Sequence, residues 1–140
     1  MAHYAFLDDN NIVTEVITGR GEDEVVDGIS NWEMYYGSIR NQRCLRTSYN
    51  TRGNTHTLGG VPFRYNYAEV GGYYDEERDG FVGVKRFPSF VLDETTLTWV
   101  APIPYPTDGI DYVWVEAEMR WVPVDEYFLH VVTTSNAESE

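Results

Sequence analysis

The chain has 140 residues, a formal net charge of −13 and an isoelectric point near 4.4. Its length predicts a single domain, and its acidity argues against a nucleic-acid groove, which needs concentrated lysine and arginine. No apolar run approaches the ~18–20 residues of a membrane helix, and the single cysteine, Cys44, excludes an internal disulfide. We therefore expect a soluble chain made in the cytosol that binds neither nucleic acid nor membrane.

The first predicted element is a β-hairpin. The stretch YAFLDDNNIVTEVITG (residues 4–19) places β-prone residues on both sides of an Asp-Asp-Asn-Asn cluster at 8–11. Asp and Asn tolerate the left-handed backbone angles of a tight turn. The cluster lacks the spaced ligands and the closing Glu of a calcium loop, so we interpret it as a turn.

A helix is predicted next, beginning near Gly21 and ending at Gly37. Acidic residues at 22–24 suit a helix N-terminus, and the apolar residues Val25, Ile29, Trp32 and Tyr36 follow at helical spacing. We expect this apolar stripe to pack on a sheet.

The segment from 41 to 60, NQRCLRTSYNTRGNTHTLGG, is rich in Asn, Thr, Ser, Gly and Arg and predicts a long loop. It belongs to a basic stretch, residues 40–86, that has eight basic and five acidic residues, a net charge of +3, whereas the rest of the chain carries −16. The centre of one copy could therefore attract the ends of another, although scattered solvated charge explains the same composition.

The second half of the chain contains a threefold repeat. The units are YYDEERDGFV (73–82), VLDETTLTWV (91–100) and VWVEAEMRWV (113–122), each with a Glu followed five residues later by Phe or Trp. Each unit predicts a strand, an acidic turn whose charge is solvated, and a returning strand. The proline-rich links between the units end strand pairing. The aromatic residues of the units could fill a core, form a protein interface or stack on a glycan.

The sequence indicates no catalytic residue, cofactor or metal. The acids at 75–79 could serve a hydrolase, but adjacent carboxylates on an exposed turn lack the opposed, apolar setting that raises a catalytic pKa. His3, His56 and His130 lack the spacing of metal ligands, and Cys44 has no evident histidine base. We therefore predict a protein that is not an enzyme.

Several blocks together resemble small structural proteins of tailed bacteriophages that infect marine bacteria and cyanobacteria. They are TSYNT (47–51), PFRYNYAEVGGYYDEERDGFV (62–82), PSFVLDE (88–94) and the WVAP…YP-x-D-G…YVW…WV string (99–122), with the similar N-terminal AHYAFLDDNNIVTEVI. The resemblance covers about residues 2–123 and implies a component of the virion. The chain departs from it at 83–86 and extends past it from Asp125.

These observations predict a mainly β fold of antiparallel hairpins in a meander, with one short helix and a long loop. A single domain over 1–123 is followed by a C-terminal arm over 124–140. The function they indicate is that of a capsid decoration or cement protein, present in many copies or as a homo-oligomer, which binds capsid or like subunits. The alternative is a tail or fibre component that binds a host receptor or glycan. The predicted partner-binding residues are Arg43, Arg46, Tyr49, Arg52, Tyr127 and Phe128.

Overall fold

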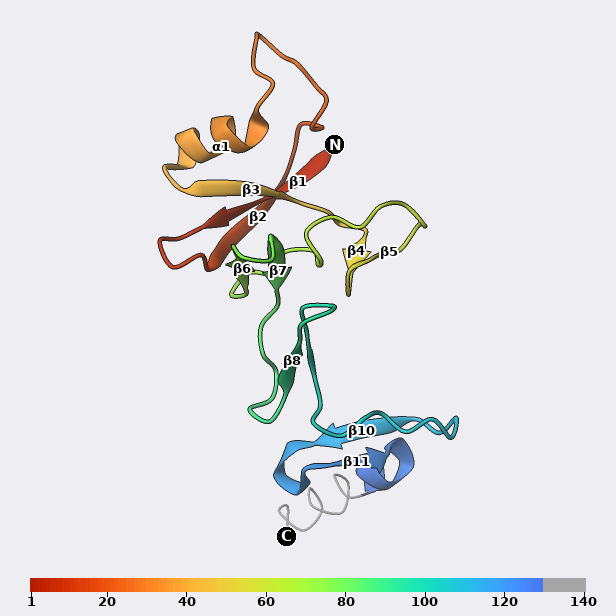
Figure 1. Ribbon diagram of the computed structural model, residues 1–140. Coiled ribbons are helices and arrows are strands. Elements are labelled where there is room, and N and C mark those ends of the chain that lie inside the picture. Colours follow the sequence, from red (N-terminus) through yellow and green to blue (C-terminus); the bar gives the residue numbers. More distant parts are fainter. Residues whose placement is uncertain (130–140) are drawn as a thin grey trace. The chain divides into compact units, whose positions relative to one another are not determined.

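The computed structural model describes residues 1–129 (Figure 1). Its strands are β1 (Ala2–Leu7), β2 (Val13–Gly19), β3 (Arg43–Thr47), β4 (Thr51–Arg52), β5 (Thr55–His56), β6 (Tyr73–Asp75), β7 (Gly80–Val82), β8 (Val91–Asp93), β9 (Thr98–Val100), β10 (Tyr112–Val115) and β11 (Arg120–Pro123). The helical elements are α1 (Trp32–Arg40), the 3₁₀ turn η1 (Glu116–Glu118) and residues 124–129. The predicted mainly β fold of antiparallel hairpins is confirmed.

The chain divides into two compact units. The first contains Met1–Lys85 and Leu92–Trp99, and the second contains Arg86–Val91 and the chain from Val100 onward. The predicted domain over 1–123 thus includes parts of both units. That these residues form a single domain stays a prediction. Of the predicted C-terminal arm, residues 130–140 lie outside the described part of the chain.

The first unit is built on a three-stranded antiparallel sheet in the order β2-β1-β3. The middle strand β1 is buried on both faces. Ala2, Tyr4 and Phe6 pack towards α1 with Trp32 and Cys44, as the helix on one side of the sheet in Figure 1 indicates. On the other face Ala5 and Leu7 pack with Val13, Ala68, Tyr74 and Phe81. Because successive residues of a strand face opposite sides, both alternating sets must be apolar.

The predicted turn between β1 and β2 is confirmed. The Asp8 carboxylate accepts hydrogen bonds from the backbone N–H groups of Asn10 (2.9 Å) and Ile12 (3.0 Å). Asn11 adopts a left-handed backbone with φ 62°. Side-chain acceptors of this kind replace the backbone partners that a turn leaves open.

The helix begins later than predicted. Asp27 and Gly28 have positive φ angles of 51° and 80°, and Val26 forms a β-bridge with Ile29, so this segment is a tight turn. The helix starts after Asn31, whose side chain accepts a hydrogen bond from the Met34 N–H (3.1 Å). The helical spacing of apolar residues therefore predicted a helix wrongly at Val25 and Ile29. It was correct at Trp32 and Tyr36, which lie in α1 and pack on the sheet.

The predicted end of the helix at Gly37 is also wrong, since α1 continues to Arg40 and Asn41 caps it with φ 51°. Gly37 is needed for another reason. A Cβ atom there would lie 2.8 Å from the carbonyl oxygen of Gln42, closer than real contacts allow. Glycine thus lets the chain fold back tightly after the helix.

The predicted long loop over 41–60 contains an edge strand of the central sheet. Strand β3 pairs with β1 over its whole length, and Cys44 and Thr47 are buried. Its polar residues are accommodated because they form hydrogen bonds: the Thr47 hydroxyl accepts one from the Ala68 N–H (2.9 Å). Strands β4 and β5 form a short hairpin in the rest of this segment.

The three repeated units all form hairpins, β6-β7, β8-β9 and β10-β11. They also share a backbone conformation, because the seventh residue of each unit is left-handed: Asp79 (φ 52°), Leu97 (φ 53°) and Met119 (φ 52°). The threefold pattern is therefore a repeat of structure as well as of sequence.

The acidic turns of these hairpins are not simply solvated, which corrects our interpretation. The repeated Glu has a partner in every unit. Glu76 pairs with Arg43, and Glu94 pairs with Arg78 at 2.9 Å. Glu116 accepts a hydrogen bond from the Ser89 hydroxyl at 2.6 Å. In the second repeat, VLDETTLTWV, the turn residue Leu97 is fully buried, and it belongs to the first compact unit of the fold.

Asn66 connects three segments of the first compact unit. Its side-chain amide lies within 3.0–3.1 Å of the carbonyl oxygens of Phe81, Thr96 and Leu97. Its carbonyl oxygen accepts a hydrogen bond from the Gly53 N–H (2.8 Å). One side chain thus satisfies backbone groups of β7, of the β8-β9 turn and of the β4-β5 turn.

We expect Asn66→Ala to lower the free energy of unfolding by about 2 kcal/mol, because carbonyl and N–H groups that are partly buried lose their partner. Urea denaturation measures this change. The control Asn10→Ala removes an exposed amide side chain from the first turn and should change stability by less than about 0.5 kcal/mol. Equal losses in the two variants would contradict the connecting role of Asn66.

The second compact unit has a much smaller core. Among its described residues the buried apolar side chains are Trp114 and Val122. Contacting rings extend this core: Trp114 lies 5.8 Å from Phe90 and 5.2 Å from Trp121, whose ring lies 5.0 Å from Tyr105. A two-stranded sheet with so few buried residues is only marginally stable by itself.

Candidate functional site

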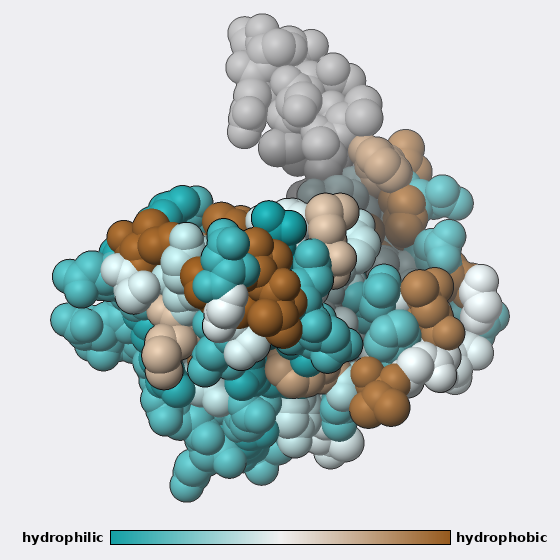
Figure 2. All heavy atoms as spheres, turned by 90° about the horizontal axis from the view of Figure 1, so that it is seen from above, coloured by the Kyte–Doolittle hydropathy of each residue, from teal (hydrophilic) through white to brown (hydrophobic). Residues whose placement is uncertain are grey.

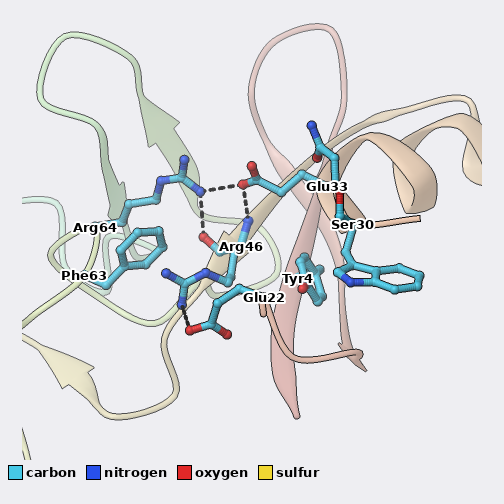
Figure 3. Close-up of a pocket in the computed structure, with 9 residues that line it drawn as sticks. Tyr4, Glu22, Ser30, Glu33, Arg46, Phe63 and Arg64 are labelled. Atoms are coloured by element: carbon cyan, nitrogen blue, oxygen red, sulfur yellow. Dashed lines mark hydrogen bonds and ion pairs between the residues drawn. The ribbon is translucent and has the colours of Figure 1, made fainter. Parts of the chain in front are cut away.

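The first unit has an open pocket of about 430 Å³ beside the N-terminus of α1 (Figure 3). It is lined by residues of β1, of the 22–33 segment, of β3 and of the 63–64 loop: Tyr4, Glu22, Ser30, Asn31, Trp32, Glu33, Arg46, Phe63 and Arg64. Of the predicted partner-binding residues, Arg46 lies here. Figure 3 shows the two arginines and the two glutamates of this pocket turned towards one another.

Arg46 is held by contacts within the chain. Its guanidinium lies over the ring of Phe63, 3.8 Å from the ring centroid, and 3.8 Å from the carboxylate of Glu22. Its backbone N–H donates to the Glu33 carboxylate at 2.7 Å. The side chain is 25% exposed, so the flat face of the guanidinium is largely covered.

Arg64 is the most enclosed charge at this pocket, with a side chain 15% exposed. It donates to the Glu33 carboxylate (2.8 Å), to the Arg46 carbonyl oxygen (2.8 Å) and, through Nε, to Asp79 (2.9 Å). Burial acts to lower the pKa of Arg64, but the bonds and charges of Glu33 and Asp79 outweigh it, so the pKa is raised. This guanidinium joins helix α1, strand β3 and the β6-β7 hairpin.

The other predicted partner-binding residues do not gather around this pocket. Arg43 pairs with Glu76 and lies 5.1 Å from the centroid of the Tyr74 ring. Tyr49 is 60% exposed and stacks on His3 at 5.6 Å. Arg52 is exposed on β4.

Tyr127 and Phe128 lie in the second unit, in the helical residues 124–129, with ring centroids 6.2 Å apart. Phe128 is 62% exposed. Four of the six predicted residues thus lie in the first unit, where they do not gather at the pocket, and two lie in the second unit.

Three of the four acids at 75–79, namely Asp75, Glu76 and Asp79, have separate partners. Asp75 pairs with Arg78 at 2.9 Å, and Asp79 accepts from the Tyr74 hydroxyl as well as from Arg64. Burial acts to raise the pKa of Asp79, but these donors outweigh it and the pKa is lowered. A general acid needs a raised carboxyl pKa, whereas the pKa values of Asp75, Glu76 and Asp79 are lowered.

No helix among the described residues, 1–129, is long and apolar enough to cross a bilayer. No three of their His, Cys, Asp or Glu side chains are grouped closely enough to hold a metal ion. The buried thiol of Cys44 has its pKa raised to about 12 by burial and by the charge of Glu33, so it is protonated at neutral pH.

Acidification should destabilise the protein. The pKa of Asp79 lies below its value in the unfolded chain, near 3.9. Its contribution to stability is therefore present above that value and is lost as the pH falls through the folded-state pKa. We expect the urea midpoint to fall between pH 5 and about pH 2. Asp79→Asn should show a smaller fall than the wild-type chain, and an equal fall would contradict the assignment.

Sequence reasoning missed Glu33, Arg64 and Asn66, which organise the first unit. Arg64 and Tyr65 have left-handed backbones, with φ 52° and 65°, and no turn residue in the sequence signals this conformation. The N-cap position of Asn31, directly before Trp32, was the signal that would have located the helix.

Comparison of the chain with protein-family models, with curated proteins and with solved structures gave no match.

Proposed function

We propose that this chain is a non-enzymatic structural protein of a bacteriophage virion, a decoration or cement protein that binds adjacent capsid subunits. The order of its sequence blocks supports this proposal, because it resembles that of phage structural proteins. The paired acids at 75–79 favour a structural role over a hydrolytic one, since their pKa values are lowered for Asp75, Glu76 and Asp79.

The observation that carries the proposal is the exposure of apolar side chains among the described residues of the second unit. Around its two-stranded sheet, large apolar side chains stand partly or mostly in solvent: Ile103 46%, Tyr105 48%, Ile110 51%, Met119 46%, Phe128 62% and Leu129 69% exposed. Large contiguous apolar patches on a soluble protein mark interaction sites. A neighbouring subunit that covers these side chains would complete the core.

The central arginines contribute less to docking than the sequence indicated. Pairs within the chain engage five of them: Arg40, Arg43, Arg46, Arg64 and Arg78. Attraction between the centre of one copy and the ends of another is therefore weaker than the charge count implies. The face shown in Figure 2 is mainly hydrophilic, with hydrophobic residues in small separate patches.

Quantitative mass spectrometry of purified particles tests the proposal. We expect the protein in the particles at a fixed ratio to the major capsid subunit. A few copies per particle, as expected for a tail fibre, would favour the tail or fibre component that is described below as the second candidate. Absence from particles of a phage that encodes and expresses the chain would contradict both.

The second candidate is a tail or fibre component that binds a glycan. The observation in its favour is the pair of stacked rings His3 and Tyr49, since Tyr49 leaves 60% of its surface in solvent and Tyr67 supports the pair from the side at 5.4–5.5 Å. Exposed aromatic faces of this kind can stack on sugar rings. A glycan array with the folded protein and with Tyr49→Ala decides this candidate: binding that Tyr49→Ala abolishes supports it, and absence of binding removes it.

A further inference from the structure

The second unit has a surface cavity of about 190 Å³ where the start of β10 meets the end of β11. It is lined by Ile110, Asp111, Pro123, Val124 and Asp125. The backbone holds this arrangement, because Tyr112 pairs with Pro123 across the hairpin and the Val124 N–H donates to the Asp111 carbonyl oxygen at 2.9 Å. Three apolar and two acidic residues therefore line one hollow.

Apolar side chains continue the surface beyond the cavity. Tyr105 lies with its ring 6.0 Å from Tyr112 and 5.0 Å from Trp121, and its hydroxyl oxygen accepts the Tyr112 N–H at 3.0 Å. The Trp121 indole donates to the Ile103 carbonyl oxygen at 2.8 Å. These contacts fix the 103–112 segment against the hairpin. We call Ile103, Tyr105, Ile110 and the cavity the loop–hairpin surface.

The two carboxylates of this surface have no cationic partner in the described chain. Neither Asp111 nor Asp125 forms an ion pair with any of residues 1–129. Residues 130–140 contain no lysine or arginine that could supply one. By contrast, Glu76, Asp79 and Glu94 of the first unit's hairpins are each paired with an arginine.

The charge of the second unit indicates what covers the loop–hairpin surface. The unit has eight acidic and two basic residues, a net charge of −6, and one of the two basic residues, Arg120, lies 3.5 Å from Glu118. A second copy is a poor occupant, because the whole chain carries −13 and seven of its nine arginines form ion pairs within the chain. A partner surface that is complementary to the loop–hairpin surface must therefore be apolar and basic.

We propose that the loop–hairpin surface docks a basic segment of a different protein, with an arginine or lysine side chain in the cavity. The aliphatic stem of that side chain packs on Ile110, Pro123 and Val124, and its charged end meets Asp111 and Asp125. Apolar residues that flank it in the partner cover Ile103 and Tyr105. This inference deepens the proposed structural role, on which it rests, by naming the surface that docks and the chemistry of its partner.

Amide shifts of the full ¹⁵N-labelled chain test the inference with the peptide acetyl-Leu-Arg-Leu-Arg-amide as probe. We expect saturating shifts confined to 101–112 and 120–125. The peptide with citrulline in place of both arginines keeps the shape and loses the charge. It should therefore bind about fivefold more weakly, the effect of losing partly exposed ion pairs. Asp111→Asn with Asp125→Asn should weaken the arginine peptide to the same extent.

The control variant Asp9→Asn with Glu77→Gln removes the same charge from exposed turns of the first unit and should leave binding unchanged. Equal weakening by both double variants would show a non-specific charge effect and overturn the inference. Equal binding of the citrulline peptide would overturn it as well. Shifts at 101–125 that follow protein concentration, with a dimer in sedimentation, would identify a second copy as the occupant and also overturn it.

These outcomes are independent of the particle analysis. A protein that is absent from virions but binds the arginine peptide at the loop–hairpin surface would lose the proposed function and keep the docking surface. A virion protein without this binding would keep the function and lose the inference.

Discussion

The Phe81→Ala variant should lose about 4 kcal/mol of the free energy of unfolding, the largest effect that we expect from a single substitution. Phe81 is 1% exposed and packs in the core cluster with Leu7, Val13 and Ala68, its ring 5.4 Å from that of Tyr74. Alanine would leave a cavity between the central sheet and the β6-β7 hairpin. Urea denaturation followed by circular dichroism measures the loss.

Phe128→Ala is the matched control, since it makes the same chemical change at a side chain that is 62% exposed. We expect it to change the stability of the isolated chain by less than about 0.5 kcal/mol. Similar losses in both variants would mean that Phe81 does not hold the hairpin on the sheet. If Phe81→Ala does not fold, Phe81→Leu keeps most of the volume and should cost about 1–1.5 kcal/mol.

The Arg64→Ala variant should lose about 3 kcal/mol. The side chain is 15% exposed, and its removal leaves Glu33 without its cationic partner and the Arg46 carbonyl oxygen without this donor. This loss is smaller than that expected for breaking a fully buried ion pair, because the side chains of Glu33 and Asp79 are 35% and 60% exposed. Thermal unfolding and urea denaturation measure the loss.

Arg120→Ala is the control for this prediction, because its pair with Glu118 is about half exposed on both sides and 3.5 Å long. We expect less than about 0.5 kcal/mol for it. Glu33→Gln tests the same network from its other end and should recover part of the loss when it is combined with Arg64→Ala, since a neutral amide tolerates the missing cation. Strictly additive losses would contradict direct coupling of Arg64 and Glu33.

The hairpins could be predicted from the sequence because their turns are local. Asp8 caps its own turn, and Asp75 and Asp93 accept from backbone N–H groups two or three residues ahead. Such bonds depend only on neighbouring residues, so the pattern of turn residues and β-prone residues specifies them.

Strand β3 could not be predicted in this way, because its residues Arg43–Thr47 are mostly polar and become a strand through pairing with β1, about 40 residues earlier in the chain. The apolar partners that cover Cys44, among them Tyr4 and Trp32, are likewise distant in sequence. Pairing with a buried strand overrides local propensity.

The ion pairs of the candidate site follow the same rule. Arg64 meets Glu33 across 31 residues, and Arg43 meets Glu76 across 33. Composition indicated a surplus of arginine in the centre of the chain but not that these arginines are used within the fold. The exposure of residues around 103–110 could not be predicted from the sequence either. It depends on how few described residues of the second unit pack against them.

The path of the chain between the two compact units has a consequence for experiments that divide it. The backbone passes from one unit to the other three times, after Lys85, after Val91 and after Trp99. A protease that cuts once between 85 and 86 would therefore leave two fragments that still share the first unit. The buried Leu97, the Arg78–Glu94 pair and the contacts of the Asn66 amide would hold them together without a covalent bond. A shortened chain that ends at Lys85 would lack the Leu97 side chain and would expose the apolar residues that it covers. Such a fragment should therefore be less stable than the intact protein.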